Sequence, residues 1–144
     1  MSIESVRASR ARALRQLPSS GRLVLVIGPP CSGKTTYVAT HAAPDDVVID
    51  LDALAQALGS PAGHDHHPHH LTAALIARDA LVQQAGAWPS TTWLITTNRR
   101  TLGNLRLPPH EVVILDTSID DCLTRARAAG RTPQVLEAIR SWTA

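Results

Sequence analysis

The chain has 144 residues, of which 44% are hydrophobic and 18% charged, and its formal net charge is +2. This length fits one domain, and the composition excludes a wholly disordered chain. No apolar run reaches the roughly 18 residues that a membrane-spanning helix needs. Two cysteines without a secretory signal predict a reduced, cytoplasmic protein with no membrane partner. Arginine outnumbers lysine so strongly that Lys34 is the one lysine of the chain.

Hydrophobic periodicity predicts alternating helices and strands along a single domain spanning residues 1–144. Residues 1–20 contain the spacing of a basic helix. The unbroken apolar run that ends at Ile27 is typical of a strand buried on both faces. The later elements are a helix over 33–41, a strand over 47–49, a short helix to 58, a His-rich loop over 59–70, a helix over 71–85, strands over 91–96 and 111–115, a helix capped by Ser118 and a last helix opened by Pro133.

The residues between the first predicted strand and the next helix match the pattern G-x-x-x-x-G-K-[ST], from Gly28 to Thr35. Backbone N–H groups of such a loop form a nest for phosphates, and the helix that follows adds its positive end. We expect Lys34 to reach the β- and γ-phosphates of ATP and the Thr35 hydroxyl to bind Mg²⁺. The expected nucleotide-binding residues are Gly28, Pro29, Pro30, Cys31, Ser32, Gly33, Lys34, Thr35, Thr36 and, from the C-terminal stretch, Arg125.

This motif and the alternation of elements predict an α/β fold of the P-loop NTPase class. It should be a three-layer sandwich, with a mostly parallel sheet of about four to five strands and helices on both faces. Cys31 lies inside the loop, where a thiol pKa is usually lowered. It is either a redox-active residue or a small side chain that fills a variable position.

Carboxylates at the ends of parallel strands lie on the ligand side of a sheet. Asp50 and Asp52 follow the second predicted strand, and two residues of an extended chain that are two apart point the same way. One could hold the Mg²⁺ shell, and we assign this to Asp50, while Asp52 accepts a proton from an attacking hydroxyl. The alternative is that Asp52 caps the next helix. Asp116, after the fourth strand, is a rival acid.

Three arginines, Arg125, Arg127 and Arg131, fall late on a predicted helix and in the turn that follows. Cations are favourable at a helix C-terminus, which is a purely structural explanation. Phosphoryl transfer also uses guanidinium groups over the transferred phosphate. We therefore interpret residues 125–133 as a short lid-like segment, with Arg127 and Arg131 on one helical face if the helix persists.

These features resemble the small P-loop kinases of the bacteriophage polynucleotide kinase type, grouped with AAA_33-like ATP-binding proteins. The resemblance rests on the P-loop, on Asp52 and on the C-terminal stretch from Arg125 to Trp142. It implies that Lys34 and Thr35 bind the donor phosphates, that Asp52 deprotonates a 5′-hydroxyl and that the lid arginines Arg127 and Arg131 clamp the phosphates during catalysis. It also leaves a phage-encoded origin in a bacterial host open.

The chain departs from this family at one position. An arginine three residues after the base usually grips the acceptor, and here that residue is Ala55. Acceptor recognition is therefore rebuilt, with Arg78, Arg99 and Arg100 as candidates, or the acceptor is not a nucleic-acid end.

Five histidines lie within seven positions of the loop: His64, His66, His67, His69 and His70. Imidazole is a common metal ligand, but the spacing lacks a structural zinc signature. A mobile loop on the acceptor side and a solvated loop are the other interpretations.

The sequence favours a kinase that transfers the γ-phosphoryl group of ATP, with Mg²⁺, to a polynucleotide 5′-hydroxyl or a nucleotide. An ATP-dependent switch or weak ATPase that acts on a protein or nucleic-acid partner is the first alternative, and Ala55 favours it. A small-molecule kinase, for nucleotides or of the zeta-toxin type, is the second.

Overall fold

The computed structural model describes residues 21–61 and 63–144 of the chain. Its centre is an all-parallel sheet of four strands in the order β2-β3-β1-β4. The strands are β1 (Leu23–Ile27), β2 (Val47–Ile49), β3 (Thr92–Thr96) and β4 (Glu111–Ile114). The predicted parallel sheet is confirmed, with four strands in the part of the chain described. The basic helix predicted within residues 1–20 lies outside the described residues.

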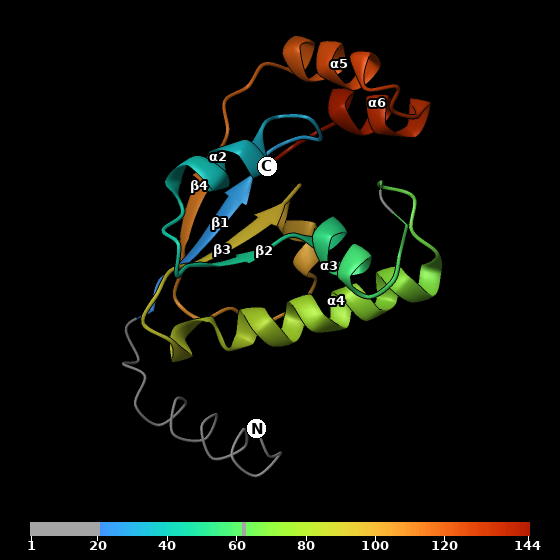
Figure 1. The fold of residues 1–144 in the computed structure, drawn as a ribbon. Coiled ribbons are helices and arrows are strands. Elements are labelled where there is room, and N and C mark those ends of the chain that lie inside the picture. The colour runs from blue at the N-terminus through green and yellow to red at the C-terminus, as the bar shows by residue number, and fades with distance from the viewer. Residues whose placement is uncertain (1–20, 62) are drawn as a thin grey trace.

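Helices cover both faces of this sheet, as predicted, and give the three-layer arrangement of a P-loop NTPase (Figure 1). One side carries α2, with α5 and α6 beyond it, and the other carries α3 and α4 (Figure 1). The helices are α2 (Lys34–His41), α3 (Leu51–Ala57), α4 (Pro68–Gln83), α5 (Ile119–Ala128) and α6 (Pro133–Arg140), with short 3₁₀ turns η1 (Ala85–Ala87) and η2 (Arg99–Leu102). Among the described residues, no helix is long and apolar enough to cross a membrane.

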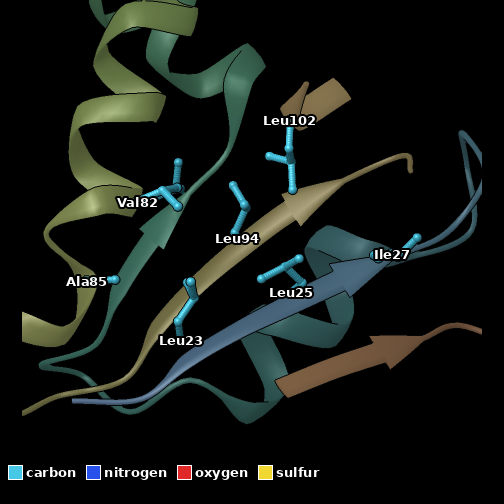
Figure 2. Close-up of a cluster of buried hydrophobic side chains, with 8 residues drawn as sticks. Leu23, Leu25, Ile27, Val82, Ala85, Leu94 and Leu102 are labelled. Carbon is cyan, nitrogen blue, oxygen red and sulfur yellow. The ribbon is translucent and has the colours of Figure 1, made fainter. Parts of the chain in front are cut away.

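Strand β1 is buried along its whole length because both of its faces are covered. Alternate side chains of a strand point to opposite faces. Leu23, Leu25 and Ile27 therefore join the cluster that contains Val82 of α4 (Figure 2), while Val24 and Val26 pack in another with Val38 of α2. The unbroken apolar run is the direct consequence of this double coverage.

The predicted start of the long helix at residue 71 is wrong, because α4 begins at Pro68 and includes His69 and His70. Proline is well suited to the first helical position, where its missing N–H would have no partner in the helix. His67 precedes it as the N-cap residue. The predicted caps at the other end of the chain are confirmed, since Ser118 Oγ accepts from the Asp121 N–H and Pro133 opens α6.

Candidate functional site

A cavity of about 1140 Å³ lies where the four parallel strands end. The segments that follow the strands each contribute to its wall, with Gly33 after β1, Asp50 after β2, Thr97 after β3 and Thr117 after β4. This is the edge at which open α/β sheets bind their ligands. The segments that follow all four strands therefore meet in one place.

The loop between β1 and α2 is held by its own lysine. Lys34 Nζ donates to the carbonyl oxygens of Gly28 and Pro29, at 2.8 Å each. Of the ten predicted nucleotide-binding residues, Arg125 and those from Pro30 to Thr36 line the cavity, whereas Gly28 and Pro29 do not. The contribution of these two residues is the pair of carbonyl groups that position the ammonium.

Close packing disfavours any side chain at Gly28 within this loop. A Cβ atom at Gly28 would lie 2.4 Å from Ser32 Oγ. Gly33 adopts φ +93° and Cys31 adopts φ 63°, a left-handed conformation that is uncommon outside glycine. The loop therefore curls tightly, and the Ser32 N–H closes it by donating to the Pro29 carbonyl at 3.2 Å.

Two observations indicate that this loop fits an anionic ligand. Burial lowers the pKa of Lys34 to about 8, so the charged ammonium carries a desolvation cost that a neighbouring anion would offset. Within the described residues, Ser32 Oγ is buried and has no hydrogen-bond partner, although Ser32 lines the cavity. Nucleotide phosphates would satisfy both groups.

The two carboxylates after β2 differ from the predicted geometry. Asp50 caps α3, and its Oδ1 accepts from the Asp52 N–H at 3.1 Å. Asp52 therefore belongs to the first turn of α3, so it is neither the helix cap nor part of an extended pair. Both residues nevertheless line the cavity. Asp116, the rival acid, is exposed and is not among the cavity-lining residues.

Two histidines of the loop between α3 and α4 bind the Asp52 carboxylate. His64 Nδ1 lies 2.8 Å from Oδ2, and His66 Nε2 lies 2.6 Å from Oδ1. Burial of Asp52 raises the pKa of this carboxyl, but the hydrogen bonds from both histidines outweigh it and leave the pKa below the usual value. Asp52 is therefore ionised at neutral pH.

The other three histidines, His67, His69 and His70, lie beside one another with ring centroids 4.3 to 5.8 Å apart. In the described ranges 21–61 and 63–144, no group of three or more histidine, cysteine, aspartate or glutamate side chains could hold a metal ion. The loop meets the cavity through His64, which is one of the lining residues, whereas His66 reaches it only through the lining residue Asp52.

The C-terminal arginines separate into two groups. Arg125 and Arg131 line the cavity, whereas Arg127 is exposed and does not. The predicted helical face shared by Arg127 and Arg131 is wrong, because α5 ends at Ala128 and Gly130 turns the chain with φ +67°. Arg131 therefore reaches the cavity from the turn after the helix.

The cavity wall includes a buried arginine, Arg78, which the sequence offered as one of three alternatives to the arginine missing at Ala55. Ala55 is fully buried, so an arginine could not occupy this position without disrupting the packing around it. Arg78 of α4 is 5% exposed and lines the cavity, and it donates to Asp79 Oδ1 and to the Thr101 carbonyl. Arg99 and Arg100 are exposed and lie outside the lining.

Sequence reasoning did not identify Thr117, whose Oγ1 donates to the Ser32 carbonyl at 2.7 Å. This bond joins the segment after β4 to the phosphate loop. The sequence also contains no indication that Trp142 Nε1 donates to the Thr97 carbonyl at 2.7 Å. This bond holds Trp142 against a residue of the cavity wall. One sequence feature could have identified Thr97 and Thr117: both closely follow predicted strands, and ligands of open α/β sheets bind at the ends of the strands.

Comparison with known proteins agrees with this geometry. Residues 23–140 match the family AAA_33, described as an AAA domain. No curated protein gives a significant match. Among solved structures, the Deinococcus radiodurans tunicamycin resistance protein is similar, with a TM-score of 0.51 and 17% sequence identity over 84% of this chain and 81% of that one. At this identity the likeness extends to the fold.

Proposed function

The chain belongs to the AAA domain family AAA_33, and from this premise we propose that it is a kinase that transfers the γ-phosphoryl group of ATP to an acceptor hydroxyl. Membership of this family supports nucleotide binding and a function of the kinase or ATPase type. The transfer, the base and the acceptor are our proposal. The resemblance to small P-loop kinases of the polynucleotide kinase type points to a polynucleotide 5′-hydroxyl or a nucleotide as acceptor.

The observation that carries the proposal is a shared cavity: Lys34 and an ionised Asp52 line the same space. Its volume of about 1140 Å³ exceeds the roughly 300–1,000 Å³ of a typical small-molecule pocket. There is room for a nucleotide beside the phosphate loop and for a second molecule beside α3. A carboxylate at that second position suits removal of a proton from a hydroxyl.

Each residue then has a defined task. Asp52 takes the acceptor's hydroxyl proton while the acceptor oxygen bonds to the γ-phosphorus and the bond to the β–γ bridging oxygen breaks, releasing ADP. Lys34, Arg125 and Arg131 stabilise the charge on the phosphate oxygens. Thr35 and Asp50 would hold Mg²⁺, which neutralises phosphate charge when bound. Thr36 lies beside them in the lining.

A second candidate, a nucleotide-dependent switch or weak ATPase, is favoured by one observation. The residue at the acceptor-gripping position is the buried Ala55, so the acceptor contact of the resembling kinases is absent there. Arg78 is the cation on that side of the cavity, which supports a rebuilt acceptor site instead. A small-molecule kinase that accepts nucleotides is compatible with the same lining.

The kinase proposal is tested by incubating the full chain with γ-labelled ATP, Mg²⁺ and a panel of 5′-hydroxyl DNA, 5′-hydroxyl RNA, nucleosides and nucleotides. We expect label on at least one acceptor, and loss of both transfer and ATP binding in Lys34→Ala. Lys34→Arg should also fail, because a planar guanidinium replaces a compact ammonium that two carbonyls position. Label that appears only as free phosphate would contradict the kinase proposal and support the ATPase.

A further inference from the structure

A chain of hydrogen bonds runs from Asp52 into the loop between α3 and α4. His66 Nε2 lies 2.6 Å from Asp52 Oδ1, and His66 Nδ1 lies 2.6 Å from Ser60 Oγ. The His66 side chain is only 4% exposed, whereas the side chain of His64, on the other carboxylate oxygen, is 53% exposed. His66 is therefore buried, whereas His64 lies at the surface.

The chemistry of the three groups sets the direction of these bonds. An ionised carboxylate only accepts, so His66 Nε2 carries the proton and donates it to Asp52 Oδ1. In the neutral ring Nδ1 then accepts, and the donor is the Ser60 hydroxyl. Both ring nitrogens are satisfied, and the ring orientation is fixed by a partner at each end.

Both ends of this chain are attached to α3. The Ser60 N–H donates to the Ala55 carbonyl at 2.9 Å, and the Gly59 N–H donates to the Gln56 carbonyl at 3.0 Å. Ser60 is 6% exposed and follows Gly59, whose φ of +107° makes the turn after the helix. The carboxylate and the serine that supports its histidine therefore belong to one rigid unit.

The Ser60–His66–Asp52 arrangement is not a nucleophilic triad. Ser60 and His66 are not among the cavity-lining residues, whereas His64 and Asp52 are. No substrate in the cavity would meet the Ser60 hydroxyl. The function left for the buried pair is to act on Asp52 itself.

We propose that His66, supported by Ser60, is a positioning residue for Asp52. It occupies Oδ1 and leaves Oδ2 for the hydroxyl that attacks ATP. That hydroxyl must displace the exposed His64, whose Nδ1 lies 2.8 Å from Oδ2. This inference rests on the proposed function, because it assumes that Asp52 is the base. A carboxylate held in one orientation avoids the loss of rate that follows from misplaced reacting groups.

The kinetic test compares His66→Ala, His66→Gln and Ser60→Ala with the control His69→Ala, an exposed histidine in the first turn of α4, using ATP and an acceptor found in the panel. We expect His66→Ala to lower kcat about 10- to 100-fold while the KM for ATP is unchanged. His66→Gln, which restores an N–H donor, should recover most of kcat, and Ser60→Ala should lie between. Unchanged kcat in His66→Ala, or no recovery in His66→Gln, would overturn the proposal.

A second readout does not depend on activity. Two-bond ¹H–¹⁵N spectra of the histidine rings should show His66 as a single Nε2–H tautomer in the wild type and as a mixture in Asp52→Ala. A mixed tautomer in the wild type would overturn the proposal even if transfer occurs. Wild-type protein that labels no acceptor but shows the single tautomer would instead contradict the proposed function and leave the contact itself established.

Discussion

Arg125 Nη1 donates to the carbonyl oxygen of Cys31 at 3.3 Å, across 94 residues of sequence. The bond joins α5 to the phosphate loop. Arg131 approaches the same residue, with Nη1 3.6 Å from Cys31 Sγ. Two guanidinium groups from the C-terminal segment are thus held over the loop, at the positions where phosphate charge would develop.

This arrangement predicts unequal effects of the three arginines of the segment. Arg125→Ala and Arg131→Ala should each lower phosphoryl transfer on the order of 100-fold, because each removes a cation that lines the cavity. Arg127→Ala is the matched control, since Arg127 is exposed and outside the lining. Rates of label transfer at saturating ATP measure this. Equal losses in all three variants would contradict the assignment.

Gly28 and Ser32 should be energetically coupled. Gly28→Ala places a Cβ atom 2.4 Å from Ser32 Oγ, so the loop must shift and ATP affinity should fall. Ser32→Gly removes the hydroxyl and its Cβ, and should restore part of the affinity in the double variant. Calorimetric Kd values for ATP in the two single variants and the double variant give the coupling. Strictly additive losses would show that the clash is not the cause.

Cys31 should be a strained position. Its φ of 63° favours glycine and opposes β-branched side chains. We expect Cys31→Gly to be at least as stable as the wild type, and Cys31→Val to lose about 1–2 kcal/mol of unfolding free energy. Urea denaturation measures both. A valine variant as stable as the glycine variant would contradict the left-handed conformation.

Asp46 should make stability depend on pH in acid. Its Oδ1 accepts from the Thr91 N–H, and its Oδ2 accepts from Trp93 Nε1 and from the Ala43 N–H. Burial raises the pKa of Asp46, but these hydrogen bonds outweigh it and lower the pKa. The unfolded chain then binds more protons, so stability is full above about pH 4 and falls as pH drops through the folded-state pKa.

Asp46→Ala should therefore lose about 2–3 kcal/mol at pH 7, at roughly 1 kcal/mol per hydrogen bond, and should show a weaker acid dependence. Its neighbour Asp45 is exposed, and Asp45→Ala is the matched control. Urea unfolding between pH 3 and pH 7 compares the two. An acid dependence that is the same in Asp46→Ala and the wild type would exclude this carboxyl as the cause.

The sequence predicted the sheet and the phosphate loop because their signals are local. A strand buried on both faces, such as β1, needs an unbroken apolar run, and the Gly28–Thr35 motif constrains its own backbone. The cap at Ser118 and the helix start at Pro133 are signals that act within one helical turn, so both C-terminal helices were also expected from the sequence.

Other parts of the site depend on contacts between distant segments. Nothing near His66 in sequence indicates that its ring would be buried against Asp52, 14 residues away. The periodicity of α5 could not show that Arg131 lines the cavity, because Gly130 changes the chain direction before Arg131. Whether Asp50 or Asp52 caps α3 also depended on where β2 ends, which sequence patterns place only to within a few residues.

The most direct test of the central claim compares Asp52→Ala with Asp120→Ala, since both carboxylates occupy the first turn of a helix and only Asp52 lines the cavity. Transfer from γ-labelled ATP to the accepted hydroxyl is measured beside ATP affinity. We predict that Asp52→Ala loses transfer at least about 100-fold while ATP affinity is retained, and that Asp120→Ala matches the wild type. Full transfer by Asp52→Ala would contradict the assignment of Asp52 as the base.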